Sequence, residues 1–221
     1  MRWWRLVCED YKVVAVRDPA TKGFFSIVSL HTGFWAVVAY RVQHALWGCG
    51  LRWLARFLAL GSRWLTGVEI HPAVVAGRRL FVDHGMGVVI GETAVLGDDV
   101  SIYQGVTLGG TSWQAQKRHP TIGNDVIIGA GAKVIGAIMV GDGARVGSNA
   151  VVVKDVPAKA TVVGVPAQVV GDKKEAQKAQ QEFRAYAQSP ECVDPILAML
   201  EDLQERVGRL EAENRRLRGE E

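Results

Sequence analysis

The sequence predicts a mainly β protein: a three-sided parallel β-helix with an N-terminal α-helical cap and a C-terminal coiled-coil helix. Three observations support this fold class. A six-residue repeat runs through residues 69–170, a Trp-rich segment with helical spacing fills residues 1–68, and a heptad pattern lies within the charged residues 171–221. We therefore expect three domains with these boundaries, the middle one catalytic.

The repeat itself defines the predicted coil. Aliphatic residues lead every hexad of its second half: Ile122, Ile128, Val134, Val140, Val146 and Val152. Glycine follows the lead in two hexads of every three, which adds a longer period of eighteen residues. A period of six within a period of eighteen predicts one triangular coil for every three hexads.

Two irregularities interrupt the repeat, and we expect the chemistry there. A two-residue slip falls near residues 85–89, directly after Asp83 and His84. A long excursion at residues 109–121 carries Arg118 and His119. Irregularities in repeated strands redirect side chains, as bulges do in sheets.

Both ends of the chain are predicted to be helical. The apolar positions that share one helical face in the cap are Trp35, Val38, Val42, Leu46 and Trp47, and a break is expected at residues 48–50. These helices would cover the first coil, whose backbone and apolar core are otherwise open. The heptad seam in residues 192–218, which favours a parallel two-stranded coiled coil, consists of Ile196, Leu200, Leu203, Val207, Leu210, Asn214 and Leu217.

Composition narrows the function classes. The formal charge of +3 is modest, and no basic stretch is interleaved with aromatic residues, so nucleic-acid binding is not expected. Three widely spaced cysteines match neither a disulfide framework nor a zinc site, which favours the reducing cytoplasm.

We expect no signal peptide. We also expect no membrane span, because four arginines interrupt the most apolar segment, residues 34–65. Attachment to a membrane surface is an alternative.

His84 is the strongest candidate for acid–base chemistry. Its small neighbours leave the ring approachable, and a neutral imidazole accepts a proton when a carboxylate holds its other nitrogen. The nearest carboxylates in the sequence are Glu69, Asp83 and Glu92. On the excursion, Arg118 suits a substrate carboxylate through a bidentate contact, although a solvated basic loop is an equal alternative.

The remaining histidines carry weaker signals. His31 and His44 lie in the predicted cap, where we expect structural roles. His71 opens the first coil, and a packing or turn role there is as plausible as a functional one. His71, His84 and His119 lack the short pair spacing of a metal site, so no metal is expected.

Four motifs together resemble the serine O-acetyltransferases, a family of hexapeptide-repeat acyltransferases. The motifs are Glu69-Ile-His-Pro, Asp83-His-Gly-Met-Gly-Val-Val-Ile-Gly-Glu-Thr, Gln104-Gly-Val-Thr-Leu-Gly-Gly-Thr and Lys117-Arg-His-Pro-Thr-Ile. Arg17-Asp-Pro-Ala and Gly164-Val-Pro-Ala fit the same family. The resemblance implies a left-handed β-helix and acetyl transfer from acetyl-CoA to the hydroxyl of L-serine, which gives O-acetyl-L-serine for cysteine biosynthesis.

The resemblance also implies roles for single residues. His84 is the general base, with Glu69 and His119 in the catalytic set; the family often has Asp where this chain has Glu69. The residues implied to bind serine are Asp18, Asp83, Arg118 and His119. The carboxylates among them face its ammonium, and the guanidinium faces its carboxylate. The residues implied to line the path of acetyl-CoA are Gly110, Ala130 and Gly131. Acetyl-CoA is expected as a co-substrate and not as a permanently bound cofactor.

The resemblance extends to partners. It implies a homotrimer or a dimer of trimers with sites between subunits, and feedback inhibition by L-cysteine. A complex with cysteine synthase is doubtful, because the docking tail of the family ends in Ile and this chain ends Arg-Gly-Glu-Glu.

Three alternatives stay open. The first is an acetyltransferase of the same fold that acts on a sugar or another hydroxyl acceptor. The second is a metal-dependent hydratase of the carbonic anhydrase type, and the third is a scaffold built around the coiled coil. Asp18 and Arg118 argue against a neutral acceptor, which needs no charged partners.

Overall fold

The computed structural model describes residues 3–21 and 23–170, so the predicted heptad helix at 192–218 lies outside the described residues. The helices are α1 (Trp3–Arg17), α2 (Phe24–Leu30), α3 (Thr32–Gly48) and α4 (Arg52–Thr66). The break predicted at residues 48–50 is confirmed. Gly50 adopts a positive φ of 82° there, a conformation that glycine reaches without strain.

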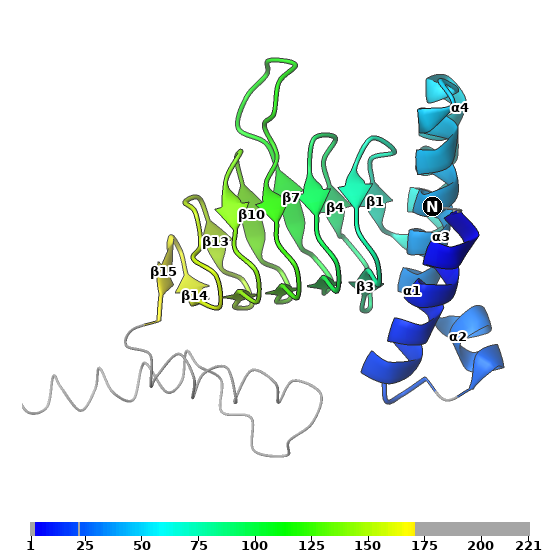
Figure 1. Ribbon diagram of the computed structural model, residues 1–221, viewed down its shortest axis with the longest axis horizontal. Coiled ribbons are helices and arrows are strands. Elements are labelled where there is room, and N and C mark those ends of the chain that lie inside the picture. The colour runs from blue at the N-terminus through cyan, green and yellow to red at the C-terminus, as the bar shows by residue number, and fades with distance from the viewer. Residues whose placement is uncertain (1–2, 22, 171–221) are drawn as a thin grey trace, which may run out of the picture. The chain divides into compact units, whose positions relative to one another are not determined.

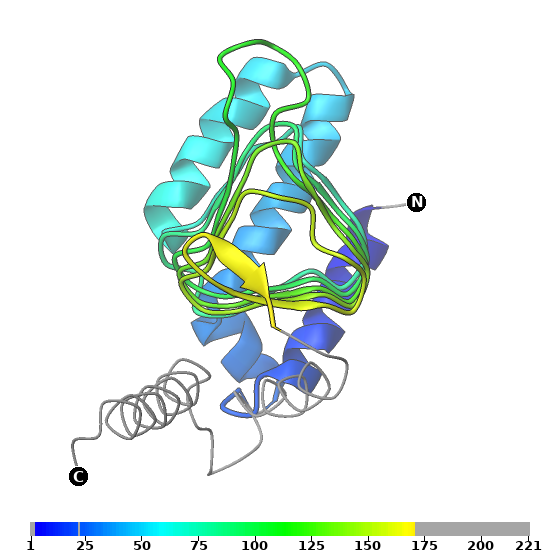
Figure 2. The same cartoon turned by 90° about the vertical axis from the view of Figure 1, so that its left-hand side faces the viewer.

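The strands that follow α4 wind into a three-sided coil, which Figure 2 shows as a triangle in cross-section. Sheet A consists of β1 (Glu69–Ile70), β4 (Val89–Ile90), β7 (Thr107–Gly109), β10 (Lys133–Ile135) and β13 (Val151–Val152). Sheet B consists of β2 (Val75–Ala76), β5 (Val95–Leu96), β8 (Thr121–Ile122) and β11 (Met139–Val140). Sheet C consists of β3 (Phe81–Val82), β6 (Ser101–Ile102), β9 (Ile127–Ile128), β12 (Arg145–Val146), β14 (Thr161–Gly164) and β15 (Ala167–Val169). Named strands pair in parallel, except that β15 returns antiparallel to β14.

The strand register confirms the eighteen-residue period. Ile90 pairs with Leu108, eighteen residues further along the chain. Across the slip, Ile70 pairs with Ile90, an offset of twenty. Across the excursion, Leu96 pairs with Ile122, an offset of twenty-six. The extra residues lie at the corners, so the strands on either side stay in register.

Two corners of the triangle carry these extra residues. The corner between sheets C and A, here called the base corner, holds residues 83–88 in the first coil. The corner between sheets A and B, here called the excursion corner, holds residues 110–120. In Figure 1 the strands of sheet A face the viewer, and the excursion projects beyond one edge of that sheet. Sheet A therefore separates the two corners.

Aliphatic side chains fill the interior of the coil. The hexad leads Ile90, Leu108 and Ile128 are almost wholly buried, as are the small residues Ala132 and Ala144 four positions after a lead. Burial of this apolar surface is the main force that holds the coils together.

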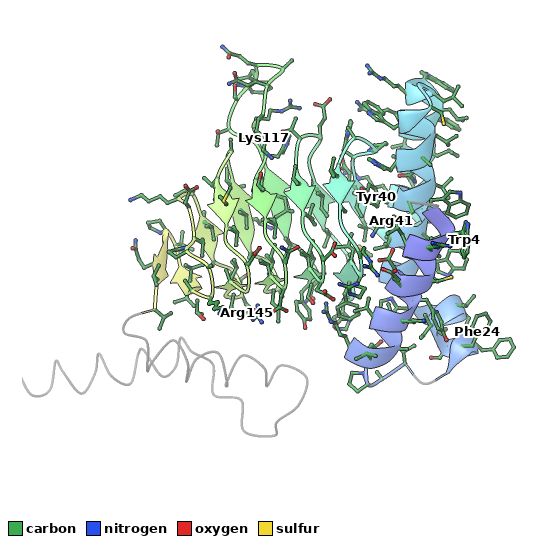
Figure 3. The ribbon with its side chains drawn as sticks, viewed as in Figure 1. Trp4, Phe24, Tyr40, Arg41, Lys117 and Arg145 are labelled. Atoms are coloured by element: carbon green, nitrogen blue, oxygen red, sulfur yellow. The ribbon has the colours of Figure 1, made fainter. Side chains whose placement is uncertain are left out.

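A buried ion pair of the cap lies against the first coil. Figure 3 labels its cationic partner, Arg41. Nε of Arg41 in α3 lies 3.0 Å from Oδ2 of Asp10 in α1. The same guanidinium donates to the carbonyl oxygens of Ala76 at 2.8 Å and Gly77 at 2.6 Å. Asp10 in turn accepts the backbone N–H of Leu80 at 3.0 Å. Removal of one partner would leave an unpaired buried charge, so this pair fixes α1 and α3 on the coil.

The apolar stripe predicted for α3 is not its inner face. Trp35 and Val42 are exposed, whereas Val37 and Tyr40 are buried. The hydroxyl of Tyr40 donates to the carbonyl of Val74 at 2.7 Å, and burial raises the pKa of Tyr40 to about 12. The polar contacts of Tyr40 and its neighbour Arg41 thus decide which side of the helix meets the coil.

Within the described residues, no single helix is long and apolar enough to cross a membrane. Helices α2 and α3 meet the limits of length and composition only as a pair, and the pair is bent by 74°.

Helix α3 begins directly against the end of β3. A Cβ on Gly33 would overlap the carbonyl oxygen of Val82, so only glycine fits this approach. The preceding residue, Thr32, donates its hydroxyl to the carbonyl of His84 at 3.2 Å. The start of α3 therefore rests on the segment that leads into the base corner.

We predict that Gly33→Ala lowers the free energy of unfolding by about 1–3 kcal/mol, because the added methyl meets backbone that cannot move aside. Thermal unfolding measures the effect. Gly48→Ala, at the last residue of the same helix and with open space around its Cβ, is the matched control. An unchanged melting temperature in Gly33→Ala would contradict the close packing of α3 on β3.

Candidate active site

The base corner presents Asp83 and His84 to solvent. His84 has a positive φ of 57°, and its side chain is 71% exposed. Gly85 and Gly87 follow with φ of 76° and 75°, conformations in which glycine is not strained. Nε2 of His84 lies 3.9 Å from Oδ2 of Asp83, too far for a hydrogen bond. The imidazole is thus exposed, with a carboxylate nearby but not bonded to it.

Helix α1 brings Asp18 to the same corner. Arg17, the last residue of the helix, donates to the hydroxyl of Ser101 at 2.8 Å and to the carboxylate of Asp99 at 3.3 Å. Ser101 belongs to β6 of sheet C, so these bonds anchor the end of the helix to the coil. Asp18 then follows immediately, and its Oδ1 accepts the backbone N–H of Ala20 at 2.9 Å.

His31 joins this group from the start of α3. Its Nε2 lies 3.7 Å from Oδ2 of Asp18. Burial lowers the pKa of His31, although the carboxylates of Asp18 and Asp83 act in the opposite direction and His84 adds to the lowering. Three segments of the chain therefore converge at the base corner, from α1, from α3 and from the slip.

At the excursion corner, Thr93 holds the Arg118–His119 dipeptide. Its hydroxyl oxygen accepts the backbone N–H of Arg118 at 3.0 Å and that of His119 at 3.1 Å. Its own backbone N–H donates to Nδ1 of His119 at 3.2 Å. Since Nδ1 acts as an acceptor, the proton of the neutral ring lies on Nε2. Gly91 leaves room for that ring, because a Cβ there would overlap Nε2 of His119.

An open pocket of about 400 Å³ lies beside this dipeptide, lined by Glu92, Gly110, Arg118, His119 and residues of the excursion. Nη2 of Arg118 lies 2.7 Å from Oε2 of Glu92, and this hydrogen bond holds the pKa of Glu92 below its ordinary value. Burial lowers the pKa of His119, and the charge of Arg118 adds to the effect. Near neutral pH the pocket therefore offers a guanidinium and a neutral imidazole N–H.

The residues expected along the path of acetyl-CoA fall at both corners. Gly131 lies at the base corner, where a Cβ on Gly105 of the previous coil would come within 3.4 Å of its Cα. Ala130 precedes Gly131 at the same corner. Gly110 lies at the excursion corner, against the side chain of Arg118.

Three further residues named from the sequence have partners of their own. Glu69 forms an ion pair with Arg63 at 2.8 Å, and no hydrogen bond joins it to His84 among the described residues. His71 accepts a backbone N–H two residues on at 3.1 Å and packs edge-on against Trp47, a turn and packing role. His44 contacts the carbonyl of Pro72 at 2.9 Å, in agreement with a structural role.

The predicted site residues thus form two groups in one chain. The base-corner group is Asp18, Asp83, His84, Ala130 and Gly131. The excursion group is Gly110, Arg118 and His119. The groups lie at opposite edges of sheet A, so neither combines the exposed histidine with the guanidinium.

This chain is similar in sequence and fold to proteins of a known family. The family model described as bacterial transferase hexapeptide (six repeats) matches residues 119–154. A serine acetyltransferase of Mycobacterium tuberculosis is 50% identical over 203 residues, which cover 92% of this chain and 86% of the relative. The chain belongs to the serine acetyltransferase family. The Bacillus subtilis member is 42% identical over 211 residues, 96% of this chain and 94% of the relative.

Solved serine acetyltransferase structures agree in fold. The Neisseria gonorrhoeae enzyme in complex with serine has a TM-score of 0.74 and 44% identity, and the match covers 77% of this chain and 69% of that one. A complex with cysteine has a TM-score of 0.75 and 42% identity, over 76% and 70% of the two chains. A complex with CoA has a TM-score of 0.71 and 42% identity, over 76% and 69%.

Four residues contribute to the two groups without a role predicted for them there from the sequence. Gly91, Glu92 and Thr93 shape the excursion group, and the Gly-Glu-Thr run within the second motif is their only local signal. The fourth is His31, because nothing local in the sequence indicates that it meets Asp18.

We predict that Thr93→Val lowers kcat/KM for serine by about tenfold to a hundredfold. Two backbone N–H groups lose their acceptor, and one such group left unpaired already costs about 1–3 kcal/mol. Thiol release from acetyl-CoA measures the rate. Thr161→Val is the control, since within the described residues the buried hydroxyl of Thr161 has no hydrogen-bond partner. Wild-type kinetics in Thr93→Val would show that Arg118 and His119 keep their places without this hydroxyl.

Proposed function

We propose that this chain transfers the acetyl group of acetyl-CoA to the hydroxyl of L-serine, giving O-acetyl-L-serine for cysteine biosynthesis, at a site assembled from two chains. Membership of the serine acetyltransferase family supports the reaction. The observation that carries the shared site is the division of the charged residues between the two edges of sheet A.

His84 is the general base of this reaction. Its exposed imidazole takes the proton of the serine hydroxyl as that oxygen attacks the thioester carbonyl. When the carbon–sulfur bond breaks, the imidazolium returns the proton to the thiolate of CoA. The ring is regenerated neutral, and the products are free CoA and the acetyl ester.

Opposite charges hold the amino acid. Asp18 and Asp83 at the base corner face its ammonium, and Arg118 at the excursion corner faces its carboxylate. His119 belongs to the same pocket, and its Nε2–H serves as a neutral donor to the substrate or to the developing oxyanion. A neutral sugar acceptor would leave these charges unpaired, so the family membership and the charge pattern together favour serine.

A homotrimer with threefold symmetry brings the two groups together. Such a ring repeats one heterologous contact three times, so the base corner of each chain can meet the excursion corner of the next. Acetyl-CoA then lies along the seam between chains, with Ala130 and Gly131 on one side and Gly110 on the other. The coiled coil predicted at residues 192–218 could join two trimers.

Glu69 keeps its proposed role as the carboxylate that orients His84. Its ion pair with Arg63 joins two partly exposed side chains, and such pairs contribute little to stability, so exchange of partner costs little.

We further propose that the β-helix is left-handed, that residues 1–68 form the cap and that residues 69–170 form the catalytic domain. The exposed free thiols of Cys8 and Cys49 favour the reducing cytoplasm.

L-cysteine is proposed as an inhibitor at the serine site. It carries the same ammonium and carboxylate as serine, with a thiol in place of the hydroxyl. A serine acetyltransferase structure in complex with cysteine supports this proposal.

We predict that His84→Ala lowers kcat by about 10²–10⁴, the usual contribution of a positioned base. Thiol release from acetyl-CoA with L-serine measures kcat, and added L-cysteine in the same assay tests inhibition. His44→Gln, a histidine of the cap, is the control and should retain turnover. Near-normal kcat in His84→Ala would remove His84 from the role of base.

We predict that two inactive variants complement each other when co-expressed. The His84→Ala chain retains an intact excursion group, and the Arg118→Ala chain retains an intact base-corner group. In a random mixture of trimers, one interface in four would join an intact base-corner group to an intact excursion group. About a quarter of wild-type activity should therefore return. The assay uses a serine concentration at which each variant alone is nearly inactive. No recovery in trimers shown to be mixed would place the whole site within one chain.

A further inference from the structure

His31 carries a buried N–H donor that has no hydrogen-bond partner in the part of the chain that the structure describes. Its Nδ1 accepts the backbone N–H of Phe34 at 2.9 Å, which caps the first turn of α3. Because a backbone N–H can only donate, Nδ1 holds a lone pair and the proton of the neutral ring is on Nε2. That Nε2 is buried and has no hydrogen-bond partner among the described residues.

An unpaired buried donor is costly, and a native structure keeps few of them. Oδ2 of Asp18 lies 3.7 Å from this Nε2, and the side chain of His31 is only 6% exposed. A shift of less than 1 Å would bring the two atoms within hydrogen-bonding distance. The ring is thus placed to bond the carboxylate of Asp18 after a small movement.

The neighbours of His31 connect this donor to the base corner. The residue after His31, Thr32, donates its hydroxyl to the carbonyl of His84, so the start of α3 is joined to the base corner. Asp18, Asp83 and His84 are the groups whose charges most affect His31 among the described residues.

We propose that His31 is a positioning residue of the acceptor pocket: its Nε2–H donates to Asp18 and holds that carboxylate toward the ammonium of the bound amino acid. The proposal rests on the proposed function of Asp18 as the partner of the ammonium. A neutral donor suits this task, because a cation beside Asp18 would repel the ammonium. Burial, which lowers the pKa of His31, keeps the ring neutral.

Two substitutions separate this role from helix capping. In His31→Asn the side-chain oxygen can still accept the N–H of Phe34, since Asn is a favoured N-cap residue, but the distal donor is lost. In His31→Gln the amide nitrogen reaches about as far as Nε2 and restores a donor. We expect His31→Asn to raise the KM for serine about tenfold and to leave kcat and the KM for acetyl-CoA unchanged. In His31→Gln the KM for serine should return close to the wild-type value.

A wild-type serine KM in His31→Asn would overturn the proposal. So would an equal rise in KM in both variants together with an equal fall in melting temperature, because that pattern belongs to a structural role. Asp18→Asn separates this result from the proposed function. If Asp18→Asn alone leaves the serine KM unchanged, the role of Asp18 is wrong. If it raises the KM while His31→Asn does not, only the inference about His31 fails.

Discussion

The buried pair of Asp10 and Arg41 is the contact on which the rest of the structure depends. The first coil of a parallel β-helix has backbone groups that no earlier coil can pair. Arg41 satisfies the carbonyls of Ala76 and Gly77, and Asp10 satisfies the N–H of Leu80. The ion pair thereby satisfies three backbone groups of the first coil. It also holds α1 and α3 where their ends reach the base corner, which is why residues far apart in the sequence become neighbours there.

Three histidines of the coil and the cap are held as neutral donors, whereas His84 is left exposed. His31, His71 and His119 each accept a backbone N–H on Nδ1, and burial lowers the pKa of each ring. Their rings are fixed as neutral donors through Nε2. His84 is exposed on a positive-φ corner, and its nearest carboxylate oxygen is 3.9 Å away. Backbone geometry, more than the identity of the side chain, sets these different roles.

The sequence was sufficient to predict the helical cap and the three-sided parallel coil, because the hexads, the slip and the excursion are all local patterns, and the strand register confirms the coil. The coiled-coil part of the fold prediction lies outside the described residues. The sequence also drew attention to His84 and Arg118 through those irregularities. It did not reveal the inner face of α3, which the polar contacts of Tyr40 and Arg41 decide. Nor did it reveal the meeting of His31 with Asp18, since that contact depends on how two helices dock on a coil.

The position of the extra residues has a consequence for how such a protein can change. Residues added at a corner extend outward, and the strand offset grows from eighteen to twenty or twenty-six without any loss of pairing. Loop length at the excursion corner is therefore free to vary while the stacked column at Gly105 and Gly131 stays as it is. An insertion or deletion in the excursion would thus change the surroundings of Arg118 and His119 without rebuilding the coils on either side of it.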